Sequence, residues 1–188
     1  MSKIHYIILL VIVLVIATFT YKLSTNIEQT SSRPDPELRH DPDYFIGDFI
    51  ATMYDAKGLA SYTISAKYLE HFPDDDTIEI KDLKINYHDK DKQSWSTTAN
   101  NGIGYKNIEV LHLSGEVRIE NLSDNPDKKL VLMTDELRID FRTRLATTDS
   151  KVKILGKSST INAIGMDLDL NSGKLNLKSQ ARGHYVPN

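Results

Sequence analysis

The sequence predicts an all-β domain of stacked antiparallel strands, preceded by one N-terminal apolar helix. Three observations predict this class. Apolar and polar residues alternate in most segments after residue 44, which is the pattern of strands with one buried face. Clusters of turn-forming residues separate these segments, at residues 55–58, 73–76, 124–127 and 171–173. No segment after residue 22 keeps a helical period long enough for a long helix.

The N-terminal segment has the length of a transmembrane helix. Residues 4–21 carry no formal charge and are bounded by Lys3 and Lys22. At about 1.5 Å per residue, such a helix is about 27 Å long, close to the hydrocarbon thickness of a bilayer. We therefore expect residues 1–22 to anchor the chain in a membrane through an apolar surface that includes Ile7, Leu10, Val13 and Ile16.

A cleaved signal peptide is the alternative for this segment. Cleavage requires small residues in an A-x-A arrangement after the apolar core, whereas Ala17 is followed by Thr18 and Phe19. Lys3 and the short preceding tail favour a cytoplasmic N-terminus and export of the remaining chain. Residues 23–43 are polar and hold three of the six prolines, so they are expected to form a linker. The β-domain is then expected to span residues 44–188.

The alternating segments supply a set of apolar side chains for one face of the sheet. In a strand, residues two positions apart share a face. The expected inward-facing residues are Tyr62, Ile64, Ile85, Val117, Ile119, Leu137, Ile139, Phe141, Ile154, Leu168 and Leu175. The pattern leaves two interpretations open. If two sheets meet tightly, these residues form a closed sandwich core; if the sheets splay, the same residues line an apolar trough.

A faint internal repeat suggests that strand pairs stack along an axis. An offset of 17 residues relates Asn100 to Val117, Asp135 to Val152, and Ile164 to Ala181. Repeated strand pairs build elongated structures in which each unit contacts mainly its neighbours. The end strands of such a stack present unpaired backbone groups, which can pair with another β-protein.

Composition excludes several classes of function. The chain has no cysteine, which excludes disulfides, a thiolate nucleophile, a zinc–cysteine site and a lipoprotein anchor. Two of the 23 basic residues lie in the anchor segment, and all 26 acidic residues follow it. The chain after residue 22 therefore has a net charge of −5. A nucleic-acid partner is therefore not expected. The six histidines lack metal-ligand spacing, and residues 74–76 lack the remainder of a calcium loop, so no metal or other cofactor is expected.

Several short segments match one known family in order and spacing. They are the anchor, residues 58–66 (GLASYTISA), residues 88–92 with Trp95, residues 115–119 (GEVRI), residues 134–135, Gly156, residues 165–166 and Tyr185. On these residues the chain resembles the LptC family, the inner-membrane-anchored periplasmic component of the lipopolysaccharide transport bridge. None of the segments is a strong motif alone; the resemblance lies in their order.

The resemblance implies a twisted, open, V-shaped β-jellyroll whose apolar interior holds the acyl chains of lipopolysaccharide. Ile80 matches an interior position that faces the lipid. The N-terminal edge, near Phe49, would continue the jellyroll of LptF, and the C-terminal edge, with Leu177 and Tyr185, would pair with LptA. Gly58 and Gly156 match glycines that matter for fold and assembly in the family. The anchor would lie against the ATP-driven transporter formed by LptB, LptF and LptG and would modulate it.

Three functions are compatible with these expectations. The first is non-enzymatic lipopolysaccharide transport from the inner to the outer membrane, with lipid received from the transporter and passed to LptA. The second is a membrane-tethered structural adaptor, which joins partners through its strand edges and keeps a tight core. The third, a periplasmic enzyme acting on glycans, would need a convergent polar cluster. The sequence shows no such cluster and no hydrolase or nucleotide-binding motif.

Overall fold

The structure, a computed structural model, describes residues 16–18, 20–21, 40–88, 94–105, 108–123 and 125–185. The chain divides into two compact units, residues 1–39 and 40–188. Within the part of the chain that the structure describes, no helix is long and apolar enough to span a bilayer. Ile16 lies in a short helical stretch, while Ile7, Leu10 and Val13 lie outside the described residues. The anchor therefore stays a prediction.

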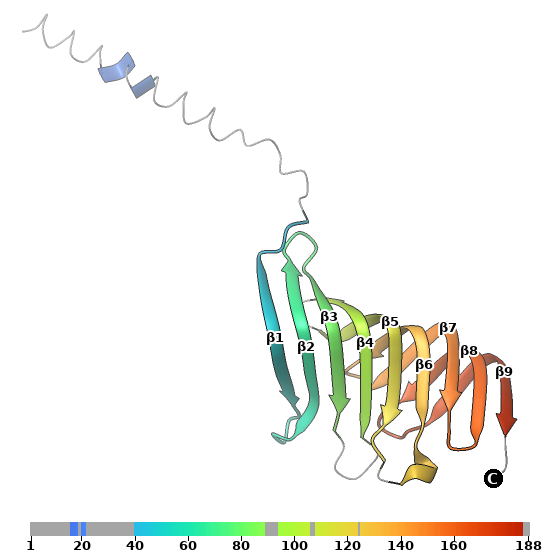
Figure 1. The fold of residues 1–188 in the computed structure, drawn as a ribbon. Helices are drawn as coiled ribbons and strands as arrows, with labels where there is room; N and C mark the ends of the chain where they lie inside the picture. The colour runs from blue at the N-terminus through green and yellow to red at the C-terminus, as the bar shows by residue number, and fades with distance from the viewer. Residues whose placement is uncertain are drawn as a thin grey trace, which may run out of the picture. The chain divides into compact units, whose positions relative to one another are not determined.

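Residues 40–185 form one antiparallel sheet of nine strands in chain order (Figure 1). The strands are β1 (Tyr44–Tyr54), β2 (Ala60–Phe72), β3 (Thr77–Tyr87), β4 (Trp95–Tyr105), β5 (Val110–Asn121), β6 (Val131–Asp140), β7 (Leu145–Leu155), β8 (Ser159–Asp169) and β9 (Leu175–Tyr185). A short 3-10 helix, η1 (Pro126–Lys128), precedes β6. The all-β architecture expected from the sequence is confirmed, and strands β1 and β9 are the two edges of the sheet.

Aspartates close several of the turns between strands. In the β1–β2 turn, Asp55 Oδ1 accepts hydrogen bonds from the backbone N–H groups of Lys57 and Leu59, at 2.8 and 2.9 Å. In the β8–β9 turn, Asp169 Oδ1 accepts one from Asn171 N at 2.8 Å. A short carboxylate side chain that binds backbone two residues ahead mimics a turn of the main chain. This explains why the clusters at residues 55–58 and 171–173 lie between strands, as predicted.

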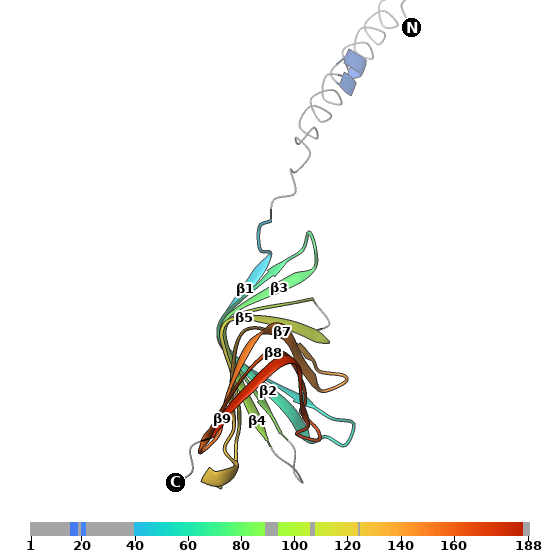
Figure 2. The ribbon, with the colours of Figure 1, turned by 90° about the vertical axis from the view of Figure 1, so that its right-hand side faces the viewer.

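The strands are bent near their middles, and the bends follow one line across the sheet. Backbone φ is positive at Asp82 in β3 (50°), Glu116 in β5 (51°) and Gln180 in β9 (50°). The regular pairing is interrupted between Thr134 and Arg138 in β6 and at matching places in β4, β5, β7 and β8. Extra residues of this kind bend a strand and increase its twist. The bends fold the sheet so that its two halves face each other (Figure 2).

The line of bends divides the sheet into two halves, half A and half B. Half A contains residues 77–81 of β3 and 137–140 of β6, and half B contains residues 83–87 of β3 and 131–134 of β6. The bend also shifts which residues point inward. In β3, Ile78 and Ile80 are buried before the bend, and Leu83 and Ile85 after it, so the period-two pattern restarts one residue out of phase.

The 17-residue offsets follow from this geometry. Asn100 lies at the bend of β4, and Val117 follows the bend of β5. The offsets from Asp135 to Val152 and from Ile164 to Ala181 likewise run from the bend of one strand to the bend of the next. The 17-residue repeat is therefore the number of residues from the bend of one strand, through the turn, to the bend of the next strand. It reflects equal arm lengths in successive hairpins, which keep the bends aligned.

Candidate functional site

The interior between the two halves is a continuous apolar layer. It brings together residues from β2 to β8, and Leu111, Ile119, Leu132, Met166 and Leu168 have no exposed surface. Burying each such side chain stabilises the fold by about 1.5–3 kcal/mol. Phe49 and Met53 of β1 and Leu175 and Leu177 of β9 are partly buried against this layer. The apolar interior thus extends from one edge strand to the other.

The predicted inward-facing residues meet in this interior. The buried members are Tyr62, Ile64, Ile80, Ile85, Val117, Ile119, Leu137, Ile139, Ile154 and Leu168, all at most 5% exposed. Phe141 and Leu175 are partly buried at its margin. Side chains of the protein itself fill the interior, so of the two arrangements left open by the sequence, the structure has the closed one.

Sequence reasoning missed several interior residues. Leu111 and Leu113 flank the exposed His112 in β5, and Leu132 lies opposite Ile119. Their alternating stretches are only two or three residues long before a bend resets the pattern. Trp95 at the start of β4 is 2% exposed. Pairing with the neighbouring strands, rather than local alternation, places these residues inside.

The mouth of the folded sheet, opposite the bend line, is closed by contacts between the halves. The rings of Tyr62 in half B and Phe141 in the β6–β7 turn meet edge to face, with centroids 4.9 Å apart. Arg144 Nη1 donates a hydrogen bond to the Tyr87 hydroxyl at 3.2 Å, and its guanidinium lies 5.6 Å from the centre of that ring. Burial raises the pKa of Tyr62, so its hydroxyl stays protonated at neutral pH. These contacts hold the mouth shut.

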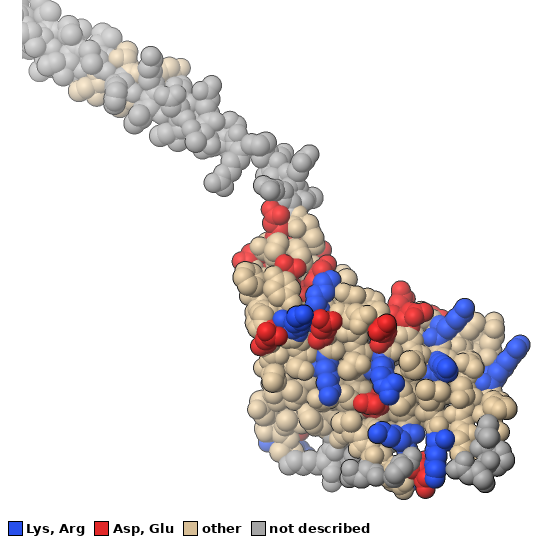
Figure 3. Space-filling view, viewed as in Figure 1, with Lys and Arg blue, Asp and Glu red and all other residues tan. Residues whose placement is uncertain are grey.

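A groove of about 1130 Å³, lined by described residues, follows the bend line. Its lining includes the exposed Lys84, Lys153 and Arg182, and also Leu83 and Val117, which are almost fully covered. Acidic residues, among them Asp82, also line it. Basic and acidic side chains are interspersed over the face of the sheet drawn in Figure 3.

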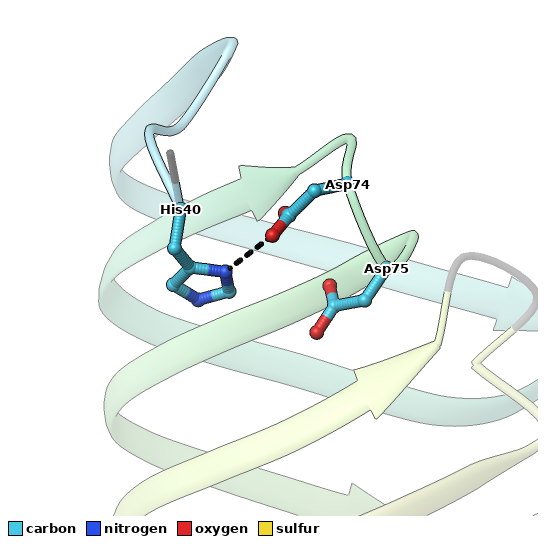
Figure 4. Close-up of side chains that lie close together, drawn as sticks. All are labelled: His40, Asp74 and Asp75. Carbon is cyan, nitrogen blue, oxygen red and sulfur yellow. Dashed lines mark hydrogen bonds and ion pairs between the residues drawn. The ribbon is translucent and has the colours of Figure 1, made fainter. Parts of the chain in front are cut away.

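A cluster of histidine and aspartate side chains fastens the chain before β1 to the β2–β3 hairpin. His40 Nδ1 lies 3.0 Å from Asp74 Oδ2, with Asp75 beside it (Figure 4), and the His40 ring stacks on Phe72 at 3.9 Å. These groups are the one place among the described residues where three potential metal ligands converge. All three are exposed, and the histidine nitrogen is already hydrogen-bonded. We assign the cluster a structural role.

His71, nearby in β2, is the buried member of this cluster. Its Nδ1 lies 2.6 Å from Asp43 Oδ1 and its Nε2 lies 3.1 Å from Asp76 Oδ1, while Tyr44 stacks on the ring at 4.7 Å. The hydrogen bond to Asp43, followed by that to Asp76, raises the pKa of His71. The first residues of edge strand β1 are therefore held by a histidine whose charged form is stabilised by two carboxylates.

The predicted partner-binding residues lie at the two edges of the sheet or in turns. Phe49 is in β1, and Gly58, with φ of +75°, lies in the β1–β2 turn. Leu177 and Tyr185 are in β9, where Tyr185 is 67% exposed. Gly156 lies in the β7–β8 turn, where its N–H donates to Ser159 O at 2.9 Å. Strand β1 also exposes Phe45, Ile50 and Tyr54.

A single antiparallel sheet, bent across its middle, with an apolar interior and two edge strands is the fold that this chain shares with LptH. The structure of LptH from Pseudomonas aeruginosa, described as the LptA-homologous periplasmic component of the lipopolysaccharide transport device, aligns with a TM-score of 0.52 and 13% identity. The alignment covers 67% of this chain and 95% of LptH. This likeness concerns the fold.

The family follows from sequence comparison. The model of the LptC-related lipopolysaccharide-assembly family matches residues 8–186, and the chain belongs to this family. The lipopolysaccharide export system protein LptC of Escherichia coli strain K12 is 26% identical over 148 residues, which are 78% of this chain and 76% of that protein. LptC of Shigella flexneri matches to the same extent. The protein is therefore a non-enzymatic component of lipopolysaccharide transport.

Proposed function

We propose that the interior between halves A and B receives the acyl chains of lipopolysaccharide. The observation that carries this proposal is the unbroken apolar layer from Phe49 in β1 to Leu177 in β9. Each methylene group left in water costs about 0.8 kcal/mol, so a lipid that crosses an aqueous compartment needs such a lining along its path. The sugars of the lipid stay outside, because the interior offers few polar groups.

Lipid admission requires the two halves to separate at the mouth. Among the described residues, the contacts across the mouth are the ring pair of Tyr62 and Phe141, the hydrogen bond from the Tyr62 hydroxyl to Phe141 O, and the hydrogen bond of Arg144 to Tyr87. The bend line on the opposite side serves as the hinge, and the strand pairing within each half remains intact. Acyl chains then replace contacts between facing side chains, which keeps the interior apolar in both states.

The two edges of the sheet are proposed to join the protein to its neighbours. Strand β1, near Phe49 and Gly58, pairs with the jellyroll of LptF, and its exposed Phe45 and Ile50 pack there. Strand β9, with Leu177 and Tyr185, pairs with LptA, and Gly156 shapes the adjacent turn. Backbone pairing at an open edge provides affinity, and side chains on alternate positions provide specificity.

Residues 1–22 are proposed to anchor the protein in the inner membrane, with the N-terminus in the cytoplasm and the β-domain in the periplasm. In this position the protein receives lipopolysaccharide from the ATP-driven transporter of LptB, LptF and LptG and passes it to LptA. The anchor lies against that transporter and modulates its activity. No cofactor takes part, since the energy comes from the transporter.

Photocrosslinking from inside and outside the sheet tests the lipid-binding proposal. A photoreactive residue replaces Ile85, Ile139 or Leu168, which are at most 3% exposed, in cells that hold the complete transport machinery. Matched controls are the adjacent Asn86, Arg138 and Asp169, which face away from the interior. Lipopolysaccharide adducts from the inner positions alone are the expected result. Equal adducts from both sets would contradict an interior path.

A structural adaptor that binds no lipid is the second candidate. The observation that favours it is the closed interior, whose central side chains have almost no exposed surface. This candidate keeps the pairing of β1 and β9 with partner proteins but predicts no lipid adducts from Ile85, Ile139 or Leu168. The absence of adducts with ATP and all partners present would establish the adaptor and reject the lipid path.

A further inference from the structure

A row of four polar-tipped residues lines the mouth end of half B. Strand pairing places Tyr62 opposite Tyr87, Tyr87 opposite Trp95, and Trp95 opposite Asn121. All four are buried, at 4% exposure or less, and each side chain carries a hydrogen-bonding atom. We call them the rim row.

The row one step deeper is apolar apart from Thr97, and consists of Ile64, Ile85, Thr97, Ile119 and Leu132. The interior is therefore layered, with apolar side chains in the depth and polar atoms at the mouth. An acylated lipid has the same order, because hydrocarbon is followed by the carbonyl groups that link it to the headgroup.

One donor in the rim row has no partner in the closed state. Trp95 Nε1 is the buried side-chain nitrogen that lacks a hydrogen bond within the described part of the chain. The side-chain amide of its neighbour Asn121 is already hydrogen-bonded elsewhere, since Nδ2 donates to Lys128 O at 2.6 Å and Oδ1 accepts from Leu130 N at 2.7 Å. Buried donors without partners are rare in native proteins. The indole N–H is thus positioned for an acceptor that the closed protein does not provide.

Arg144 brings a positive charge to the same place from the other half of the sheet. Its Nη1 contacts the Tyr87 hydroxyl at 3.2 Å and Asn171 Oδ1 at 3.4 Å. Among the described residues, no carboxylate forms an ion pair with Arg144 within 4.0 Å. The guanidinium is partly buried, and such a group binds phosphate strongly through paired N–H donors.

We propose that the rim row and Arg144 form the subsite that recognises the linkage region of the lipid. Trp95 Nε1 donates to an ester or amide carbonyl of an acyl chain, and Arg144 exchanges its contact with Tyr87 for a phosphate on the sugar. The same exchange releases one of the contacts that close the mouth, so ligand recognition and opening are coupled. This inference rests on the proposed function and assigns to Trp95 and Arg144 the recognition of the acyl carbonyl and phosphate groups of that lipid.

Trp95 is the single tryptophan of the chain, so the indole signal of the protein reports on this residue alone. Ultraviolet resonance Raman spectra of the full-length protein in maltoside micelles, which contain no carbonyl groups, report whether the indole N–H is hydrogen-bonded. Purified lipid A, the acylated disaccharide of lipopolysaccharide, is the probe. The indole band is expected to move to its hydrogen-bonded position when lipid A is added. An unchanged band, while a photoreactive residue at Ile139 still forms lipid A adducts, would overturn the role of Trp95.

Competition for the Ile139 adduct measures affinity in the second arm. Trp95→Phe keeps an aromatic side chain but removes the indole N–H donor. This variant is expected to weaken lipid A binding about fivefold. Arg144→Gln is expected to weaken it about tenfold or more, with Arg144→Lys intermediate. Dephosphorylated lipid A should bind wild type and Arg144→Gln equally. The matched control is Arg142→Gln, an exposed arginine in the same turn, which should bind as wild type does.

Failure of this inference differs from failure of the proposed function. If lipid A forms no adduct at Ile139 in the wild type, the acyl-binding interior itself is wrong and the subsite falls with it. If adducts form but Arg144→Gln still discriminates between phosphorylated and dephosphorylated lipid as strongly as Arg142→Gln does, the interior stands and the subsite is rejected. Circular dichroism of each variant separates loss of binding from loss of fold.

Discussion

Gly156 illustrates how one residue controls a turn next to the C-terminal edge. A Cβ atom at this position would lie 2.7 Å from Ser159 Oγ, within the turn that the Gly156 N–H closes. Gly156→Ala is therefore expected to destabilise the domain by about 0.5–1.5 kcal/mol, because the Ser159 side chain must turn away from its rotamer; the free energy of unfolding in urea measures this. Gly47→Ala is the control, because its Cβ would meet no atom within 4 Å.

Removal of the Ser159 hydroxyl tests whether its contact with the new Cβ causes the loss of stability. In Gly156→Ala combined with Ser159→Ala, the hydroxyl that meets the new Cβ is absent, so most of the lost stability should return. A double variant as unstable as Gly156→Ala would show that the effect arises elsewhere in the turn.

His71 predicts how stability at the N-terminal edge depends on pH. Its folded-state pKa lies above the ordinary value because Asp43 and Asp76 bind the charged ring. The stabilisation is then fully present below about pH 6.5, the pKa of an unperturbed histidine, and is lost as the pH rises through the higher folded-state value. Amide exchange in β1, corrected for intrinsic rates, should therefore reveal weaker protection above this range.

Variants separate His71 from other titrating groups. In a His40→Gln background, which removes the neighbouring histidine whose pKa Asp74 raises, His71→Gln should remove the pH dependence of β1 protection, while His112→Gln, at an exposed position of β5, should retain it. Equal pH dependence in both variants would reject the assignment to His71.

Individual strands owe their shape to residues that tolerate unusual backbone angles. Asp82 bends β3 at φ 50°, in the left-handed region where β-branched residues are strongly disfavoured. Asp82→Val is expected to cost about 1–2 kcal/mol of unfolding free energy, whereas Asp82→Gly should be close to neutral. Lys84→Val, at an exposed strand position without positive φ, is the matched control. A loss for Lys84→Val equal to that for Asp82→Val would point to the exposed valine rather than the bend.

The folded sheet as a whole predicts that its two halves must part for lipid to enter. The chain lacks cysteine, so thiols introduced at Tyr62 and Phe141, whose rings are 4.9 Å apart, can be linked by a short bis-maleimide. The link should abolish lipopolysaccharide adducts from a photoreactive residue at Ile139. Thiols at Arg138 and Thr147, paired within half A, are the control, and their linkage should leave the adducts unchanged.

The anchor also concerns the whole molecule, because it is proposed to couple the β-domain to a membrane complex. Deletion of residues 1–22, with export restored by a cleavable signal peptide, is expected to change the ATPase rate of the purified LptB–LptF–LptG complex or its association with this protein. The rate is measured with the intact protein as reference. An unchanged rate together with unchanged association would contradict a modulatory anchor.

Local pattern determined the class of fold and much of the interior. Period-two alternation at Leu83 and Ile85, and at Leu137 and Ile139, identified buried strand faces, because a pleated strand turns successive side chains to opposite sides. Asp55 and Asp169 marked turns, because their carboxylates bind backbone a few residues away. The family resemblance, carried by ordered short segments, pointed to lipopolysaccharide transport, and the family match confirms that coarse function.

Tertiary structure alone decided how those faces meet. The aligned bends at Asp82, Glu116 and Gln180 depend on register between strands, and register is a property of pairs rather than of a single segment. The contacts of Tyr62 with Phe141, and of Tyr87 with Arg144, join residues 79 and 57 positions apart. No local pattern encodes such pairs, since only the folding of the sheet onto itself brings them together and closes the interior.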